Sequence, residues 1–215
     1  DADGLAAACA AHPDAHMVAG ATDVGLWITK QHRDLGTIVA TGAARDLALV
    51  RVGSDIIEIG AAATLADAFD ALEGDYPELA EAWQRFASVP IRNAGTLGGN
   101  IANGSPIGDS MPALIALGAQ VVLRGGGTVR PMPLEDYYLA YQKTARVPGE
   151  FVAAVRVPRR AGGLALRAYK LSKRRDQDIS AVFAAFALLL DGDRIVSSRI
   201  GCGGVAATPT RATAT

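Results

Sequence analysis

One segment decides the fold of this chain: Arg92-Asn93-Ala94-Gly95-Thr96-Leu97-Gly98-Gly99-Asn100-Ile101-Ala102-Asn103-Gly104-Ser105-Pro106-Ile107-Gly108-Asp109. Its glycines alternate with Thr, Asn and Ser before the closing aspartate. Glycine is entropically costly to order, but it lets main-chain N–H groups and short polar side chains come close to a ligand. The segment therefore predicts a long loop that binds a large anionic ligand, and its few apolar side chains argue against a packing role. A structural loop without a ligand is the competing interpretation.

The glycine pattern differs from two common nucleotide motifs. It lacks the Gly-x-Gly-x-x-Gly turn of a Rossmann fold and the Lys-Ser/Thr pair of a Walker loop. Upstream, Ala19-Gly20-Ala21-Thr22-Asp23 predicts a strand end, a tight turn and a helix start capped by Thr22. The free N–H groups of a helix start can bind a pyrophosphate, although N-capping alone also explains these residues.

A third candidate segment is Lys170-Leu171-Ser172-Lys173-Arg174-Arg175-Asp176-Gln177-Asp178. Most charged runs of this kind are solvated turns. Lys170, however, stands apart from the other charges at the end of an apolar strand pattern. A cation held partly out of water there could stabilise an electron-rich ring.

The remaining pattern predicts a mixed chain of helices and strands. We expect helices over 4–11, 64–72, 77–87 and 110–117, and strands over 17–19, 37–40, 56–59 and 151–157. A hairpin is expected over 120–130 and a linker over 158–163. Antiparallel strands follow at 166–171, 180–190 and 194–201. Because this last sheet has no helix to cover it, we expect the sequence to be a piece of a longer polypeptide.

Composition excludes several classes of protein. The chain has 215 residues, half of them hydrophobic, and a formal net charge of -1, so it offers no basic face for nucleic acid. Two distant cysteines, Cys9 and Cys202, and three scattered histidines give no disulfide framework, metal site or iron–sulfur motif. No run is long enough for a membrane span and no signal peptide is present, so we expect a cytoplasmic protein without a membrane partner.

The chain resembles the FAD-binding domain of molybdenum hydroxylases, most closely that of the small FAD/iron–sulfur subunit of bacterial xanthine dehydrogenases. The resemblance lies in Val18-Ala19-Gly20-Ala21-Thr22-Asp23-Val24-Gly25, in the segment from Thr96 to Asp109, and in Tyr169 to Arg174 with Asp176 to Ser180. Three motifs occur in the same order and the resemblance covers nearly the whole chain.

This resemblance implies an α+β fold. A two-lobed FAD-binding domain of the molybdopterin dehydrogenase (PCMH-like) type would span 1–160, with lobes of about 1–55 and 56–160. The start of a C-terminal α+β flavoprotein domain with a three-stranded antiparallel sheet would span 161–215 and be incomplete. The implied FAD-binding residues are Met17, Val18, Ala19, Gly20, Ala21, Thr22, Asp23, Val24, Phe86, Gly95, Thr96, Gly99, Asn100, Asn103, Ser105, Asp109 and Lys170.

The resemblance also implies roles for these residues. Residues 17–24 and 95–100 would surround the pyrophosphate and ribityl chain, while Ser105 and Asp109 would lie at the adenosine end, with Asp109 accepting from ribose hydroxyls. Phe86 would lie against the flavin and Lys170 at the isoalloxazine edge. The loop 174–179 would border the approach of a nicotinamide. Gln177 is neutral where some relatives carry an acid, so no electrostatic role is assigned to it.

The implied activity is electron transfer by an oxidoreductase. A molybdenum cofactor on a partner subunit would oxidise a purine, iron–sulfur clusters on another domain or subunit would pass electrons on, and FAD would deliver hydride to NAD⁺. No general base and no metal ligand are assigned to this chain. Three alternatives stay open: the medium subunit of a hydroxylase acting on carbon monoxide, nicotinate, an aldehyde or an aromatic thioester; a non-catalytic FAD-binding scaffold; and a nucleotide-sugar binder.

Overall fold

The computed structural model describes residues 1–213. The helices are α1 (Ala2–Ala11), α2 (Val24–Thr29), α3 (Leu65–Asp75), α4 (Ala80–Gln84), α5 (Val89–Ala94), α6 (Leu97–Asn103) and α7 (Ser110–Ala116). The strands are β1 (His16–Val18), β2 (Ile38–Ala40), β3 (Val50–Val52), β4 (Ile56–Gly60), β5 (Gln120–Gly125), β6 (Thr128–Pro133), β7 (Tyr138–Ala140), β8 (Lys143–Thr144), β9 (Phe151–Pro158), β10 (Leu164–Leu171), β11 (Val182–Asp191), β12 (Arg194–Gly203) and β13 (Thr210–Ala212).

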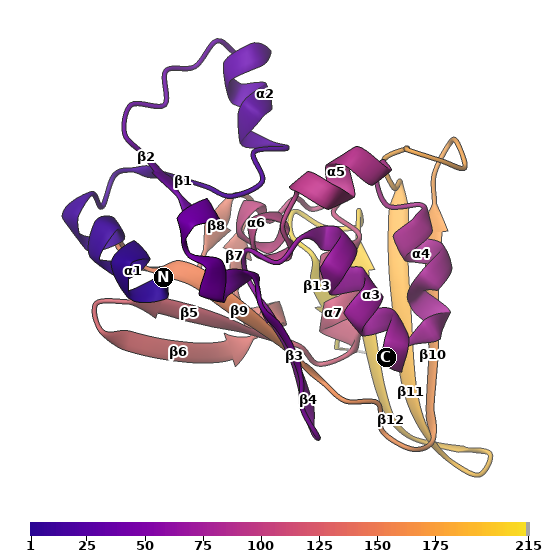
Figure 1. The fold of residues 1–215 in the computed structure, drawn as a ribbon. Coiled ribbons are helices and arrows are strands. Elements are labelled where there is room, and N and C mark those ends of the chain that lie inside the picture. Colours follow the sequence, from indigo (N-terminus) through magenta and orange to yellow (C-terminus); the bar gives the residue numbers. More distant parts are fainter. Residues whose placement is uncertain (214–215) are drawn as a thin grey trace.

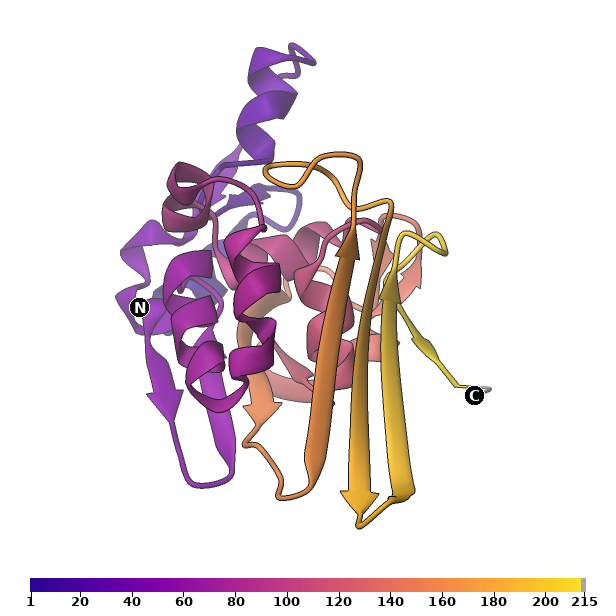
Figure 2. The same cartoon turned by 90° about the vertical axis from the view of Figure 1, so that its right-hand side faces the viewer.

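Two antiparallel sheets enclose a layer of helices. A five-stranded sheet has the order β3-β4-β9-β5-β6, and a four-stranded sheet has the order β10-β11-β12-β13. Helices α3, α6 and α7 lie between them (Figures 1 and 2). Every residue of α7 is buried, as expected for a helix that is covered on both sides. A single hydrophobic cluster joins Ile57 of one sheet, Leu114 of α7 and Phe183 of the other sheet.

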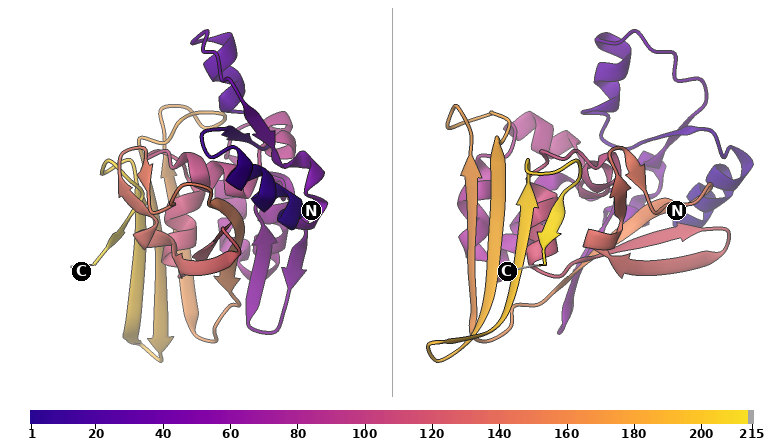
Figure 3. Two further views of the ribbon diagram at one scale, coloured as in Figure 1. Left: turned by 90° about the vertical axis from the view of Figure 1, so that its left-hand side faces the viewer. Right: turned by 180° about the vertical axis from the view of Figure 1, so that it is seen from behind.

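The N-terminal part covers the outer face of the five-stranded sheet. Leu5 and Cys9 of α1 pack there against Phe151 of β9, in a second hydrophobic cluster. The parallel pair β1-β2 follows, and the segment between these strands carries α2 away from the body of the molecule (Figures 1 and 3). Helix α2 has no buried residue. This projecting segment forms one wall of the candidate site.

The α+β fold and the antiparallel meander β10–β12 confirm the sequence-based predictions. Several elements differ. The predicted helix over 77–87 is a 3₁₀ turn, Pro77–Leu79, followed by α4. The C-terminal sheet has a fourth strand, β13, and β3, β7 and β8 were not predicted because each has only two or three residues.

The glycine-rich segment is largely helical, which corrects the prediction of a long loop. Thr96 caps α6 by accepting from the Gly99 N–H, and Leu97 and Ile101 are fully buried. A Cβ at Gly98 would lie 2.3 Å from the Ala61 Cβ, so this glycine allows α6 to pack against the end of β4. The segment therefore has a packing role, which its glycine-rich composition did not indicate.

The predicted linker over 158–163 is anchored to the end of α3. Arg159 pairs with Asp75, and Arg160 makes a two-pronged bond to Glu78 at 2.7 and 2.8 Å. The Tyr76 hydroxyl donates to the Pro158 carbonyl at 2.6 Å. Hydrogen bonds from these arginines hold the pKa values of Asp75 and Glu78 below their ordinary values.

Acid should weaken this anchor. A carboxylate whose folded-state pKa lies below its unfolded value contributes stability above the unfolded pKa and loses it as pH falls through the folded pKa. We predict that the free energy of unfolding falls below about pH 4–5, and that the Asp75→Asn/Glu78→Gln variant shows a shallower acid slope than the parent chain. Urea unfolding at a series of pH values measures both slopes. Equal slopes would contradict the assignment.

A buried ion pair joins α7 to the C-terminal sheet. Lys170 Nζ of β10 lies 2.6 Å from Asp109 Oδ2, next to the start of α7, and 2.8 Å from Ser180 Oγ. The Ser180 hydroxyl donates to Asp109 Oδ1 at 2.6 Å. The Lys170 and Asp109 side chains are 3% and 5% exposed. The pair thus holds β10 and the start of β11 against the helical layer.

Removing one partner of this pair should be costly. Lys170→Met leaves the Asp109 carboxylate buried without its cation, and we expect the free energy of unfolding to fall by about 3–5 kcal/mol. The double variant Lys170→Met/Asp109→Leu should recover most of that loss. Arg51→Met is the matched control, because its pair with Glu58 is largely exposed and is worth about 0–1 kcal/mol. Equal losses in Lys170→Met and Arg51→Met would contradict this account.

Candidate functional site

A cavity of about 830 Å³ lies between the projecting N-terminal segment, α6 and the stretch from β7 to the start of β9. Its volume falls within the roughly 300–1,000 Å³ of ordinary ligand sites. Its walls come from five parts of the chain: residues 9–33, residues 39–47, residues 61–65, residues 86–104 and residues 138–152. The site therefore depends on the tertiary fold and not on one local motif.

The turn that follows β1 supplies free hydrogen-bond donors. Within residues 1–213, the main-chain N–H groups from Gly20 to Val24 donate to no acceptor. Ala21 has a φ of 55°, which turns the backbone sharply at the cavity wall. A Cβ at Gly20 would lie 1.9 Å from the Ala94 carbonyl oxygen, so only glycine lets this turn pack against the end of α5. The result is a row of free N–H groups at the cavity wall, and free N–H groups of this kind can bind an anion.

The second glycine motif has no comparable supply of donors. The N–H groups at the start of α6 are used inside the protein: Gly95 donates to Ile91 O, Leu97 to Ala63 O, Gly98 to Ala61 O, Gly99 to Thr96 Oγ1 and Asn100 to Thr96 O. That residues 95–100 surround the pyrophosphate and ribityl chain stays a prediction, and these N–H groups are not free to donate to a ligand there. The motif instead gives the cavity a smooth wall, in which the missing side chains leave room for a ligand.

The structure brings most of the predicted site residues to this one cavity. Those that line it are Met17, Ala19, Gly20, Ala21, Thr22, Asp23, Val24, Phe86, Gly95, Thr96, Gly99, Asn100 and Asn103. Val18, Ser105, Asp109 and Lys170 do not line it.

The buried ion pair contains two residues whose predicted roles at FAD stay predictions. Both carboxylate oxygens of Asp109 accept bonds, one from Lys170 and one from Ser180, and the side chain is 5% exposed. The charge of Lys170 is likewise neutralised by Asp109 and is not a free cation at the edge of the cavity. Spacing in the sequence could not reveal this pairing, because 61 positions separate the two residues.

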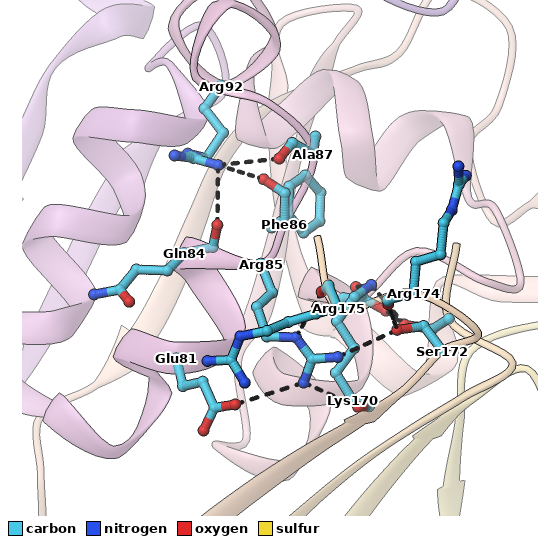
Figure 4. A network of polar contacts seen from close by, with 12 residues as sticks. Glu81, Gln84, Arg85, Phe86, Ala87, Arg92, Lys170, Ser172, Arg174 and Arg175 are labelled. Atoms are coloured by element: carbon cyan, nitrogen blue, oxygen red, sulfur yellow. Dashed lines mark hydrogen bonds and ion pairs between the residues drawn. The ribbon is translucent and has the colours of Figure 1, made fainter. Parts of the chain in front are cut away.

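Phe86 lies on a tightly held turn at one end of the cavity. Its ring meets Phe69 of α3 edge-on, with centroids 5.2 Å apart. Arg92 Nη1 donates to the carbonyls of Phe86, Ala87 and Gln84, at 2.6, 3.3 and 3.4 Å (Figure 4). This clamp holds Ala87 at a φ of 48°. The hydrogen bonds from Arg92 to the main chain of this turn therefore fix the position of the Phe86 ring.

Arg85, on the same turn, binds the loop between β10 and β11. Its guanidinium donates to Lys170 O at 3.1 Å, Arg175 O at 3.0 Å and Ser172 Oγ at 3.2 Å (Figure 4). Through Arg85, the loop that the sequence expected beside a nicotinamide is tied to the turn that carries Phe86.

Sequence reasoning missed part of the cavity wall. Trp27, Arg33, Tyr138, Lys143 and Arg146 all line it. The Arg33 guanidinium lies 4.6 Å above the Trp27 ring, and the Tyr138 hydroxyl donates to Ile101 O at 3.1 Å. No local signal marked residues 138–150, since they reach the site only through the packing of β7–β9.

Residues 1–213 contain neither a metal site nor a membrane-spanning helix. No group of three or more His, Cys, Asp or Glu side chains is arranged to hold a metal ion. No helix in this part of the chain is long and apolar enough to cross a membrane. Cys9 lines the cavity, and burial raises the pKa of its thiol against the opposing effect of Arg146.

Comparison with known proteins gives consistent matches along the chain. A family model described as the FAD binding domain in molybdopterin dehydrogenase matches residues 1–160, and one described as the CO dehydrogenase flavoprotein C-terminal domain matches residues 167–215. Xanthine dehydrogenase of Emericella nidulans is 30% identical over 199 residues, which cover 87% of this chain and 15% of the relative.

Carbon monoxide dehydrogenase proteins are similar as well. The medium chain from Afipia carboxidovorans is 36% identical over 180 residues, covering 82% of this chain and 59% of the relative. The structure of carbon monoxide dehydrogenase from Hydrogenophaga pseudoflava superposes with a TM-score of 0.91 at 27% identity, covering 98% of this chain and 74% of that chain. The chain thus spans between 15% and 59% of the length of the two curated relatives.

The cavity agrees with these matches in its size and its free N–H donors, which fit a dinucleotide with a central pyrophosphate. The chain belongs to the family of FAD-binding domains of molybdopterin dehydrogenases, and its cofactor is FAD.

Proposed function

We propose that this chain is the FAD-binding module of a xanthine dehydrogenase-like molybdenum hydroxylase that uses NAD⁺ as its electron acceptor. The observation that carries the proposal is the row of unpaired N–H groups from Gly20 to Val24 at the cavity of about 830 Å³. We further propose that the FAD-binding domain ends near residue 160, with a division between its lobes near residue 55. The match of one family model to 1–160 and of another to 167–215 supports the first boundary.

The residues of this chain act by binding and orienting the cofactor. The N–H groups of residues 20–24 bind the pyrophosphate, and Phe86, held by Arg92, packs against the flavin. Arg85 holds the loop 172–179 at the same end, where a nicotinamide would approach. When bound, FAD would supply the chemistry that accepts electrons one at a time and delivers two of them as a hydride.

The partners in this proposal are a subunit with a molybdenum cofactor and an iron–sulfur domain or subunit. The similarity to xanthine dehydrogenase of Emericella nidulans supports a purine as the substrate of the partner. We include a cytoplasmic location, which the two free cysteines support.

A medium chain of a carbon monoxide dehydrogenase-like enzyme is the second candidate. The observations that favour it are the 36% identity to the medium chain from Afipia carboxidovorans and the TM-score of 0.91 to the enzyme from Hydrogenophaga pseudoflava. The two candidates share the FAD site and differ in the substrate of the partner subunit, and reaction with NADH tests the proposed NAD⁺ acceptor.

We predict that the purified chain takes up one FAD and that NADH bleaches its flavin absorbance. Gly20→Ala should abolish uptake, because its Cβ would push the turn away from Ala94 and displace the N–H donors. Gly42→Ala is the control, since a Cβ there meets nothing within 4 Å. Absorbance spectra and an NADH titration give both results.

Thermal unfolding of each variant shows whether it is folded. A parent chain that unfolds cooperatively but takes up no FAD would contradict the proposed function. Uptake of FAD without bleaching by NADH would contradict NAD⁺ as the acceptor and would favour a scaffold.

A further inference from the structure

Helix α2 carries apolar side chains on more than one side, and none of its residues is buried. Leu26 and Ile28 are 47% and 48% exposed, and because they are two positions apart they point to different sides of the helix. Val24 and Trp27 face the cavity, and the only polar side chain of α2 is Thr29. A helix without a charged face is normally buried. Helix α2 therefore presents an uncovered apolar surface outside the cavity.

The rest of the chain does not hold this helix by polar contacts. Within residues 1–213, the hydrogen bonds of residues 21–34 stay inside the segment 21–36, and none of its charged side chains forms an ion pair. The superposition on carbon monoxide dehydrogenase from Hydrogenophaga pseudoflava covers 98% of this chain, so it includes this segment. A projecting position that recurs in a related enzyme without internal polar contacts indicates a surface for a partner.

The exposed surface continues onto α5, beside Phe86. Gly20, at the base of the projecting segment, contacts Ala94 at the end of α5. Helices α2 and α5 lie at the same end of the molecule (Figures 1 and 2). Val89 of α5 is 58% exposed and follows Phe86 by three positions. A partner that covers α2 and α5 therefore lies next to the turn that packs against the flavin in the proposed function.

This position suits the electron donor of the flavin. Electron transfer slows steeply as the distance between two redox centres grows, so the donor must dock close to Phe86. The loop 172–179, which Arg85 ties to this turn, is the proposed approach of the nicotinamide, and this leaves the α2 side to the donor. Two cations, Lys30 and Arg33, follow α2, against one acid, Asp34. A cluster held by thiolates is anionic, so this positive edge favours an iron–sulfur domain.

We propose that α2 and the start of α5 form the docking surface for the iron–sulfur domain or subunit that supplies electrons to the flavin. This inference rests on the proposed function, to which it adds the place of the partner on this chain. Leu26 and Ile28 enter an apolar groove of the partner, and Val89 extends the contact. The molybdenum subunit and a second copy of this chain are the competing occupants.

The intact enzyme, in which the tagged chain is co-expressed with its iron–sulfur and molybdenum subunits, tests this assignment. In Leu26→Glu/Ile28→Glu, the iron content per FAD after size-exclusion chromatography and the rate at which xanthine bleaches the flavin should each fall at least about tenfold, because carboxylates replace apolar anchors. FAD content and bleaching by dithionite should match the parent, since neither residue lines the cavity. Ile195→Glu is the control, because Ile195 is 56% exposed at the β11–β12 turn, away from α2 (Figure 1).

The outcomes separate this inference from the proposed function. Unchanged iron content and unchanged bleaching by xanthine in the α2 variant would overturn the inference. Loss of molybdenum with iron retained would also overturn it, and so would a dimer of this chain alone that the variant abolishes in analytical ultracentrifugation. Val89→Glu repeats the test if the α2 variant does not unfold cooperatively. A parent chain that binds the iron–sulfur subunit but no FAD would contradict the proposed function and still support the docking surface.

Discussion

The contact between Gly20 and the Ala94 carbonyl is the constraint on which the site depends. A Cβ at position 20 would lie 1.9 Å from that oxygen, so the turn after β1 reaches α5 and α6 only because it lacks a side chain. This contact places the N–H groups of residues 20–24 along the cavity, and it joins the projecting N-terminal segment to the glycine-rich helix. The Gly20 turn and the glycine-rich segment are therefore two sides of one interface. The turn supplies free N–H groups, and the segment supplies a wall that leaves room for a ligand.

The rest of the fold supports that interface from behind. Gly98 allows α6 to approach Ala61, and the fully buried helix α7 holds α6 between the two sheets. The buried pair of Asp109 with Lys170 then secures the C-terminal sheet to this layer. On the side of Phe86, Arg92 and Arg85 tie the aromatic turn to its own carbonyls and to the loop 172–179. Hydrogen bonds from these arginines to main-chain carbonyls thus position the uncharged ring of Phe86.

The sequence predicted the elements of this arrangement better than their contacts. The Gly20 turn, the meander β10–β12 and most of the cavity residues follow from local patterns and from the resemblance to a family. The helical state of residues 97–103 was hidden, because glycine and asparagine are poor helix formers and tertiary packing overrides that propensity. Local spacing could not predict the pair between Asp109 and Lys170, because the two residues are far apart in the sequence. For the same reason it could not predict that Arg146 lines the cavity.

Amide hydrogen exchange with and without FAD tests the central claim most directly, because it reads the main-chain donors one by one. The account predicts that FAD slows exchange at residues 20–24, whose N–H groups are free, and leaves residues 97–100 nearly unchanged, because their N–H groups already donate within the protein. Protection confined to residues 95–100, with residues 20–24 unaffected, would contradict it.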